Sequence, residues 1–372
     1  MSLISSISGI RGTIGGKVGE NLTPIDIVKY VSAFITLLKE NEPNKTLRIV
    51  VGRDARISGE MVSSIVCGTI QSMGADVIDV GLSTTPTVEM SVVSHKADGG
   101  IIITASHNPM QWNALKLLRS NGEFVSGADG VRIQQWVKEA NFTYAEAKKL
   151  GHYSFYENAI ADHIEKILAL EWVDVDAISR ANFNVAVDAV NSTGGIAIAQ
   201  LLKKLGVKRS TILNGEPTGV FAHNPEPLPE HLAEISNLID KNSFHVGFVV
   251  DPDVDRLAIV MENGEMFGEE YSLVAIADYI LQNQKGNTVS NLSSTRALRD
   301  ISEKYGVSYA AAAVGEVNVV EKMKETNAII GGEGNGGIIL PALHYGRDAL
   351  VGIALFLTYM AKTKKSPVQI KS

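Results

Sequence analysis

Blocks of apolar and polar residues follow one another along the chain in an order that occurs three times. In residues 47–81, an apolar run precedes a polar loop, a segment with apolar residues at helical spacing, a glycine and a second apolar run. Residues 183–213 and 287–315 have the same order. This order is typical of a strand, a helix and a second strand, paired in parallel through a right-handed crossover. It predicts parallel sheets with helices on both faces.

Glycine marks the end of each predicted helix. This residue readily takes the left-handed backbone conformation that closes many helices. The three glycines are Gly74, Gly206 and Gly306. In the second predicted helix, the apolar residues at helical spacing are Ile196, Ala199, Leu202 and Leu205. This spacing indicates a helix.

The repeated unit predicts a chain of several related domains. The chain has 372 residues, which is too long for one ordinary core. We expect an α/β fold of three related domains, each a mixed, mostly parallel sheet sandwiched by helices, arranged around a central cleft. The predicted domains are residues 1–150, 151–257 and 258–372. In open sheets of this kind, ligands bind at the carboxyl ends of the strands.

Composition and charge narrow the class of protein. Apolar residues make up 45% of the chain, and the formal net charge is −7 without a basic run that would track nucleic acid. The apolar stretch 349–361 is too short to span a bilayer and predicts a core helix. The single cysteine, Cys67, allows no disulfide within the chain and is predicted to be buried and inert. We expect a cytoplasmic monomer or homodimer that acts on a small molecule and binds neither nucleic acid nor a membrane.

The loop after the predicted strand 99–104 places a serine at the carboxyl end of that strand. Ser106 is followed directly by His107 and an Asn-Pro turn. A serine hydroxyl needs a base or a metal to become a nucleophile, and no G-x-S-x-G motif indicates a hydrolase triad. Lys116 is a candidate acid–base group because burial can lower a lysine pKa, and His107 is a candidate to orient the site. The alternative is a simple turn or helix cap.

Three aspartates at alternate positions, Asp251, Asp253 and Asp255, follow another apolar run. Carboxylates in a tight loop repel one another unless a cation binds, and they supply the hard oxygen ligands that Mg²⁺ prefers. An EF-hand needs glycine where Arg256 stands and a helix where an apolar strand follows, so we exclude that motif. A phosphotransferase whose nucleophile is the first aspartate of the loop stays an open alternative.

A glycine-rich segment that begins at Gly332 contains the pattern G-x-G-x-x-G. A dinucleotide-binding loop of this pattern must open a helix, whereas residues 338–340 predict a second strand. We expect a hairpin in which Gly332 lets the backbone approach a ligand, while Glu333 and Asn335 bind sugar hydroxyls. The alternative is a hairpin with exposed polar tips.

Arginines near predicted strand ends are candidate phosphate ligands. Arg11 lies among glycines, and Arg53 and Arg56 follow a predicted strand. A guanidinium matches phosphate oxygens in a bidentate geometry, although a surface position or an ion pair is the alternative for each arginine. The histidines without metal-ligand spacing, which are predicted to be structural, are His95, His223 and His344.

Together these segments resemble the α-D-phosphohexomutase family, which includes phosphoglucomutase, phosphomannomutase and phosphoglucosamine mutase. The segments that carry the resemblance are SGIRG, VGRDAR, TASHNP, DPDVDR and GGEGNGG, in the family's order and over nearly the whole chain. The resemblance implies an isomerase of carbohydrate metabolism that interconverts hexose 1-phosphate and hexose 6-phosphate by intramolecular phosphoryl transfer. It also implies that Ser106 is a phosphoserine, with a hexose 1,6-bisphosphate as intermediate and activator.

The resemblance gives each candidate residue an expected role. The residues expected to be catalytic are Ser106, Lys116, Arg11 and His107. Those expected to bind the phosphosugar substrate are Gly332, Glu333, Asn335 and Arg256. The expected Mg²⁺ ligands are Ser106, Asp251, Asp253 and Asp255.

Two features depart from the family pattern. Asn335 stands where the family's sugar loop usually has serine, and its amide still donates and accepts hydrogen bonds. With HYGRDAL downstream, the loop resembles the mixed group of phosphoglucosamine mutases and phosphoglucomutase/phosphomannomutases. The fourth family domain, with its R-x-S-G-T-E-P-like phosphate clamp, has no counterpart in the sequence, and its absence predicts weaker substrate binding. The competing hypotheses are a Mg²⁺-dependent aspartyl phosphatase or phosphotransferase and a non-catalytic phosphosugar-binding module.

Overall fold

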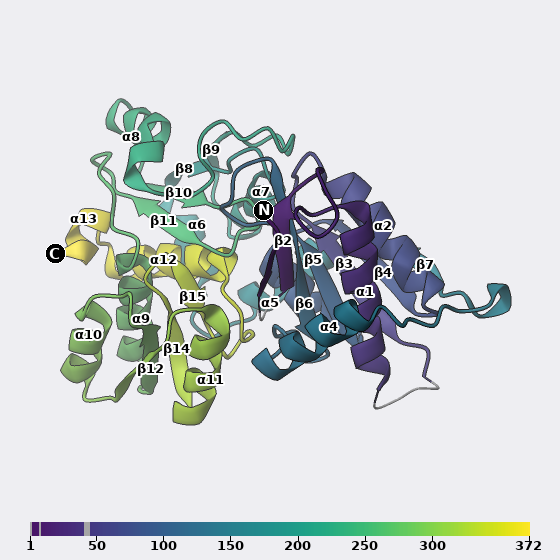
Figure 1. The fold of residues 1–372 in the computed structure, drawn as a ribbon. Coiled ribbons are helices and arrows are strands. Elements are labelled where there is room, and N and C mark those ends of the chain that lie inside the picture. The colour runs from purple at the N-terminus through teal and green to yellow at the C-terminus, as the bar shows by residue number, and fades with distance from the viewer. Residues whose placement is uncertain (1, 7–8, 41–44) are drawn as a thin grey trace. The chain divides into compact units, whose positions relative to one another are not determined.

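The computed structural model describes residues 2–6, 9–40 and 45–372, and the chain divides into two compact units (Figure 1). The first unit consists of residues up to Ile160 with Thr218–Val220, and the second of Ala161–Pro217 with Phe221–Ser372. The described residues form three mixed sheets, one in the first unit and two in the second. Helices flank each sheet, which confirms the predicted α/β class.

In the described part of the first unit, seven strands form one sheet in the order β1-β2-β6-β5-β3-β4-β7. Parallel pairs join β5, β3, β4 and β7, and antiparallel pairs join β1, β2, β6 and β5. The strands are β1 (Ile4–Ser6), β2 (Gly9–Thr13), β3 (Arg48–Arg53), β4 (Asp76–Leu82), β5 (Gly99–Ile103), β6 (Trp112–Arg119) and β7 (Tyr153–Phe155). Because β5 is the central strand, the loop that leaves its carboxyl end has a neighbouring strand on each side.

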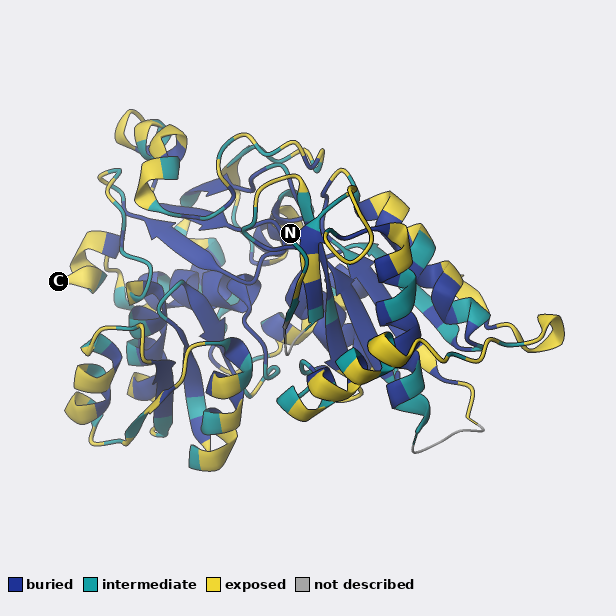
Figure 2. Cartoon of the chain, in the orientation of Figure 1, coloured by how far each residue is buried: buried dark blue, intermediate teal, exposed yellow. Residues whose placement is uncertain are grey.

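Helices cover both faces of this sheet because its central strands are apolar on both sides. Along β3, Ile49 and Val51 belong to the core shared with α1 and α2, whereas Val50 belongs to the core shared with α3. The helices are α1 (Pro24–Lys39), α2 (Gly59–Ser72), α3 (Thr85–Ser94), α4 (Gly127–Glu139) and the 3-10 helix η1 (Ala147–Lys149). The central strands are buried along their length, whereas the helices expose their outer faces (Figure 2).

The second unit, in which every residue is described, contains two four-stranded sheets of the same design. Their orders are β11-β10-β8-β9 and β13-β12-β14-β15. In each sheet three parallel strands are extended by a hairpin, so that β11 and β15 are antiparallel edge strands. The strands are β8 (Asn184–Asp188), β9 (Arg209–Leu213), β10 (Val246–Val250), β11 (Leu257–Val260), β12 (Asn287–Asn291), β13 (Tyr309–Ala312), β14 (Ala328–Glu333) and β15 (Gly337–Ile339).

One apolar helix, α12 (Ala349–Thr363), forms the centre of the second unit. Nearly all its residues are buried, which confirms the core helix predicted for this stretch. The ring of Phe356 lies 6.2 Å from that of Phe248 on β10 and 5.5 Å from that of Phe267. The other helices are α5 (Ala159–Leu168), α6 (Val175–Ala181), α7 (Gly194–Lys204), α8 (Ala233–Asp240), α9 (Tyr271–Asn283), α10 (Ala297–Tyr305), α11 (Glu316–Thr326), α13 (Pro367–Lys371) and the 3-10 helix η2 (Pro229–His231).

The predicted helix ends agree with the structure, and of the four apolar residues noted at helical spacing Leu202 and Leu205 are buried. Glycines with positive φ follow α2, α7 and α10, at Gly74, Gly206 and Gly306. In α7, Ala199 is exposed and Ile196 is only half-buried. The helix begins at Gly194, and its buried series continues through Ala197, Ile198, Leu201 and Leu202. A sequence in which almost every position is apolar does not reveal which stripe meets the sheet.

The first two sheets extend across the two predicted domain boundaries. β7 pairs with β4 and β11 pairs with β10, so the first and second sheets continue past residues 150 and 257. Cys67 is buried, and burial raises the pKa of its thiol to about 12, as expected for an inert cysteine. Within the described ranges, no helix combines the length and the apolar character that a membrane crossing needs.

Candidate functional site

Ser106 lies in a tight loop three residues beyond the end of β5. It is buried, and its φ of 48° places a residue other than glycine in the left-handed region, which is uncommon. Its N–H donates to Oγ1 of Thr104 at 2.9 Å. The Oγ atom of Ser106 lies 3.4 Å from Nδ1 of His107, so the imidazole contacts the hydroxyl. The loop therefore presents one hydroxyl in a constrained backbone.

Arg56 holds this loop in place through hydrogen bonds to its backbone. Its fully buried guanidinium donates to Oδ2 of Asp54 at 3.1 Å, and Thr104 donates to the same oxygen at 2.6 Å. It also donates to loop carbonyl oxygens, those of Ser106 (2.5 Å), Asn108 (2.7 Å), Pro109 (2.8 Å) and Trp112 (2.9 Å). Arg56 is thus a structural arginine in a buried ion pair, not a phosphate ligand. Sequence reasoning found the arginine but missed what it binds.

Two further candidates lie on β6, which pairs with β5, and on β2, which pairs with β6. Lys116 is on β6, opposite Ile102 of β5, and its Nζ lies 3.5 Å from Oγ1 of Thr85. Arg11 is on β2, opposite Ala114 of β6, and its side chain is exposed. The neighbouring Ser8 of the SGIRG segment lies outside the described residues. The first unit therefore carries Arg11, Ser106, His107 and Lys116, and the other candidates belong to the second unit.

The three aspartates occupy the turn of the β10–β11 hairpin. All three are fully buried, and one carboxylate oxygen from each lies within 4.8 Å of the others. Oδ1 of Asp251 accepts hydrogen bonds from the N–H groups of Asp255 and Arg256, each at 3.1 Å, and so shapes the turn. The φ of 62° at Val254 is strained for a β-branched residue, which shows how tightly the turn is wound.

The donor set of this turn fits a divalent cation. Oδ1 of Asp253 and Oδ1 of Asp255 are buried carboxylate oxygens that accept no hydrogen bond from the described residues. Burying three like charges together is costly without a compensating cation, and hard oxygen ligands suit Mg²⁺. The turn is supported by Ser192 and Thr193, whose hydroxyls donate to the carbonyl oxygen of Pro252 at 2.7 and 2.8 Å. No pattern in the sequence pointed to those two supports.

Arg347 joins the acidic turn to the glycine-rich hairpin, and sequence reasoning missed it. Its Nη2 donates to Oδ2 of Asp255 at 2.7 Å, and its Nη1 donates to Oε2 of Glu333 at 2.8 Å. Its Nε lies 3.1 Å from Oε2 of Glu316 at the start of α11. Burial alone would lower the pKa of this guanidinium, but the three carboxylates raise it well above its usual value. The only indication of this residue in the sequence was its position in the HYGRDAL segment, which is part of the family resemblance.

The glycine-rich segment forms the β14–β15 hairpin, as predicted, and leads into strand β15 and not directly into a helix. A Cβ on Gly332 would lie 1.9 Å from the carbonyl oxygen of Gly337, so only glycine fits there. Oε1 of Glu333 accepts from Nδ2 of Asn291 at 2.9 Å and from the N–H of Gly315 at 3.1 Å. A carboxylate has about four acceptor positions, so Glu333 keeps one for a ligand. Asn335 is half-buried at the tip.

Arg256 follows the acidic turn and is mostly buried. Its Nη1 makes a long contact of 3.5 Å with Oε1 of Glu226, and its Nε donates no hydrogen bond to the described residues. This guanidinium is therefore only weakly held by its surroundings. An anion near the acidic turn would find donors in it.

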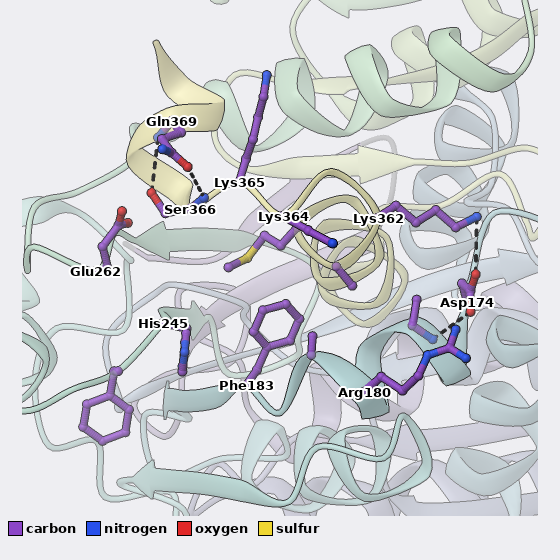
Figure 3. Close-up of a pocket in the computed structure, with 15 residues that line it drawn as sticks. Asp174, Arg180, Phe183, His245, Glu262, Lys362, Lys364, Lys365, Ser366 and Gln369 are labelled. Atoms are coloured by element: carbon purple, nitrogen blue, oxygen red, sulfur yellow. Dashed lines mark hydrogen bonds and ion pairs between the residues drawn. The ribbon is translucent and has the colours of Figure 1, made fainter.

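A large cavity in the second unit is separate from these residues (Figure 3). It encloses about 910 Å³ beside the ends of α6 and α12 and beside α13. Apolar side chains such as Phe183 and Met360 line it together with Arg180, Lys364 and Lys365. None of the residues predicted to bind substrate or metal is among its lining residues.

Three domain models of one family match the chain in order. Their description is phosphoglucomutase/phosphomannomutase, alpha/beta/alpha domain I, II or III. Domain I matches residues 4–144, domain II matches 161–264 and domain III matches 269–372. These ranges contain all the candidate residues, with the serine in the first domain, the aspartates in the second and the glycine-rich hairpin in the third.

Individual relatives are similar over most of their length. A Thermococcus kodakarensis protein named phosphoglucomutase/phosphomannomutase is 35% identical over 358 residues, which cover 95% of this chain and 77% of the relative. A Sulfurisphaera tokodaii phosphoglucosamine/phosphogalactosamine mutase is 29% identical over 375 residues, 100% of this chain and 80% of the relative. The crystal structure of a phosphoglucomutase/phosphomannomutase family protein from Burkholderia thailandensis has a TM-score of 0.84 at 25% identity, covering 96% of this chain and 77% of that one.

Proposed function

The chain belongs to the phosphoglucomutase/phosphomannomutase family, a family of isomerases, and from this premise we propose that it interconverts a hexose 1-phosphate and the corresponding hexose 6-phosphate. The observation that carries the proposal is the buried acidic turn, which Arg347 joins to Glu333. This arrangement sets a candidate cation site beside a candidate sugar site. The names of the relatives support phosphoglucose, phosphomannose or phosphoglucosamine as the substrate.

In the proposed first half-reaction, phosphoserine 106 gives its phosphoryl group to the free hydroxyl of the substrate. The substrate oxygen forms a bond to phosphorus as the bond between phosphorus and Oγ of Ser106 breaks. Lys116 accepts the hydroxyl proton, and Oγ keeps the electron pair of the broken bond and takes a proton from His107, which it contacts at 3.4 Å. The reverse steps on the other phosphate of the bisphosphate restore phosphoserine, neutral Lys116 and protonated His107.

Asp251, Asp253 and Asp255 are proposed to hold Mg²⁺ together with an oxygen of the Ser106 phosphate. When bound, Mg²⁺ neutralises charge on the phosphoryl oxygens. Arg347 fixes the orientation of Asp255, and the N–H groups of Asp255 and Arg256 fix that of Asp251. The chain thus supplies three carboxylate ligands, two of which, Asp251 and Asp255, are oriented by these hydrogen bonds.

The remaining candidates are proposed to position the substrate. Glu333 is held by Arg347, Asn291 and Gly315 and retains acceptor capacity for one sugar hydroxyl. Asn335 is proposed to donate to a second hydroxyl, and Gly332 lets the hairpin backbone come close to the sugar. Arg11 and Arg256 are proposed to contact phosphate, since Arg11 is exposed on β2 and Arg256 makes only a long contact of 3.5 Å with Glu226.

The proposal is tested by incubating the protein with Mg²⁺ and glucose 1,6-bisphosphate labelled in its phosphates, then mapping the label. We expect an acid-stable label on Ser106 and turnover of at least one of glucose 1-phosphate, mannose 1-phosphate and glucosamine 1-phosphate. Ser106→Ala should abolish the label and lower turnover by roughly 10³-fold or more. Ser120→Ala, a change at an exposed serine, is the matched control.

Two results would contradict the proposal. An acid-labile label on Asp251 would favour an aspartyl phosphotransferase. Sugar phosphate binding without label or turnover would favour a binding module. Because aspartyl phosphate hydrolyses in acid and phosphoserine does not, one acid treatment separates the two enzymatic mechanisms.

A further inference from the structure

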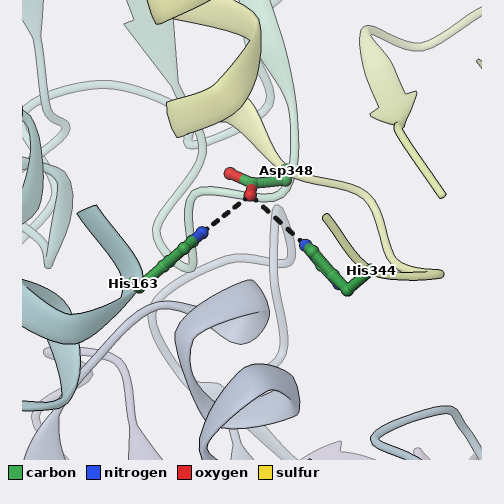
Figure 4. Close-up of side chains that lie close together, drawn as sticks. All are labelled: His163, His344 and Asp348. Atoms are coloured by element: carbon green, nitrogen blue, oxygen red, sulfur yellow. Dashed lines mark hydrogen bonds and ion pairs between the residues drawn. The ribbon is translucent and has the colours of Figure 1, made fainter. Parts of the chain in front are cut away.

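Two histidines and an aspartate meet inside the second unit, at the start of α12. Nε2 of His163, on α5, lies 2.9 Å from Oδ2 of Asp348, and Nε2 of His344 lies 3.3 Å from the same oxygen (Figure 4). His163 and Asp348 are buried, and His344 is half-buried. His163 and Asp348 are 185 residues apart in the sequence, so no local motif indicates this cluster.

We propose that His163, His344 and Asp348 bind one divalent transition-metal ion of the Zn²⁺ type, at a site separate from the Mg²⁺ site of the acidic turn. The site would tie α5 and the segment before α12 to the first turn of α12. It does not depend on the proposed mutase activity.

The spacing of the three ligand atoms suits a small tetrahedral ion. Zn²⁺ binds imidazole nitrogen and carboxylate oxygen at about 2.0–2.2 Å, so neighbouring ligands of a tetrahedral site are roughly 3.3–3.5 Å apart. The nitrogen–oxygen separations of 2.9 and 3.3 Å are close to this spacing, and all three ligand atoms lie within 4.8 Å of one another. Three protein ligands leave a fourth position for water.

The surroundings of Asp348 orient it as a metal ligand. It is the N-cap of α12, where its Oδ1 accepts from the N–H groups of Leu350 and Val351 at 2.8 and 3.2 Å. The N–H of Asp348 donates to the carbonyl oxygen of Ile338 at 2.9 Å. One carboxylate oxygen is thus fixed by the helix while the other faces both imidazoles. Hydrogen bonds of this kind to a metal ligand keep it in the geometry that a metal needs.

Charge also favours a cation at this place. Burial alone would raise the pKa of Asp348, but interactions with His163 and His344 hold it well below its usual value, so the carboxylate is ionised. Both Nε2 atoms face Oδ2, and in the absence of a metal each must carry a proton there. A dication bound at both Nε2 atoms displaces those protons, and each ring that ligates it is neutral with its remaining proton on Nδ1.

The donor set distinguishes this cluster from the acidic turn. Two imidazoles and one carboxylate prefer Zn²⁺, Co²⁺ or Fe²⁺, whereas three carboxylates suit Mg²⁺. His344 was expected to be structural because no other residue lies at metal-ligand spacing from it in the sequence. The fold brings the distant His163 to Asp348 as a second imidazole, which the sequence did not show.

The test is titration of chelator-treated protein with Co²⁺ in excess Mg²⁺, followed by visible ligand-field absorption, with Zn²⁺ as competitor. We expect one Co²⁺ per chain with a tetrahedral spectrum that Zn²⁺ abolishes. Asp348→Asn should lower the affinity by roughly 100-fold or more while keeping the helix cap, because Asn also caps helices. His344→Gln should behave alike. His152→Gln, at an exposed histidine, and Asp253→Asn, in the acidic turn, should leave Co²⁺ binding unchanged.

A second measurement uses the unaltered protein. In NMR spectra of protein with ¹⁵N-labelled histidines, Zn²⁺ should remove the Nε2 protons of two histidines. At one equivalent of Zn²⁺, both Nε2 signals should have left the positions they have in the metal-free protein. If both Nε2 atoms stay protonated in excess Zn²⁺, the cluster is only a hydrogen-bonded triad and the proposal fails. It also fails if Asp253→Asn, and not Asp348→Asn, removes Co²⁺ binding.

Discussion

Arg347 and Asp255 form a buried ion pair in which Nη2 donates to Oδ2 at 2.7 Å. The same guanidinium contacts Glu333 and Glu316, so one cation compensates three carboxylates from three separate segments. Asp255 belongs to the turn of one sheet and Glu333 to the hairpin of another. One side chain therefore contributes to the orientation of both a candidate metal ligand, Asp255, and the candidate sugar ligand, Glu333.

Replacing this cation should cost much of the stability of the second unit. In Arg347→Met the three carboxylates would lose their buried counter-charge, and breaking a buried ion pair from one side costs about 3–5 kcal/mol. We expect the free energy of unfolding, measured by urea denaturation, to fall by that amount. Arg299→Met, which breaks an exposed pair with Glu303, is the control and should change it by less than about 1 kcal/mol. Equal effects in the two variants would contradict this reading of Arg347.

The acidic turn should respond to Mg²⁺ in a way that depends on Asp253. In the unaltered protein, Mg²⁺ at about 100 times its dissociation constant should stabilise the fold by about 2.7 kcal/mol, and a chelator should reverse this. Asp253→Asn removes one of three repelling charges, so we expect a metal-free form of equal or greater stability and little response to Mg²⁺. Thermal unfolding with and without Mg²⁺ measures both effects. A full response to Mg²⁺ in Asp253→Asn would exclude this aspartate as a ligand.

Arg56 should affect catalysis without contacting substrate. Its guanidinium organises the Ser106 loop through four carbonyl oxygens, and a lysine cannot reproduce that fork. Because a displacement of about 1 Å can cost roughly 10²-fold in rate, we expect Arg56→Lys to lower kcat by that order. Mg²⁺-induced stabilisation should persist, since the acidic turn is intact. Arg48→Lys, at the exposed first residue of β3, the strand that precedes Arg56, should leave kcat unchanged, and an equal loss there would contradict the prediction.

The sequence reveals the ligand-bearing loops because their chemistry is local. Three aspartates at alternate positions and a glycine-rich hairpin are visible in a few residues, and the apolar runs before them identify the strands. Arg347 was missed because its partners Asp255 and Glu333 are 92 and 14 residues away, and an arginine alone does not indicate which carboxylates surround it. In α7 the helical spacing alone did not indicate which apolar residues are buried, since packing against the sheet selects the buried stripe. Long-range pairs such as His163 and Asp348 appear only once the chain is folded.

His223 and Asp188 should make the stability of the second unit depend on pH. Nε2 of His223 lies 3.0 Å from Oδ2 of Asp188 and Nδ1 lies 2.8 Å from the carbonyl oxygen of Asn224, so only the protonated ring donates to both acceptors. Burial alone would lower the pKa of His223, but the hydrogen bond and charge of Asp188 raise it above 6.5.

A raised folded-state pKa gives stability that is complete below the unfolded pKa and is lost as pH rises through the folded pKa. Between about pH 5.5 and about pH 8.5, which spans the ordinary histidine pKa, His223→Gln should therefore lose less stability than the unaltered protein in urea unfolding. The exposed-site variant His152→Gln should retain the original pH dependence, and the same dependence in His223→Gln would refute the assignment.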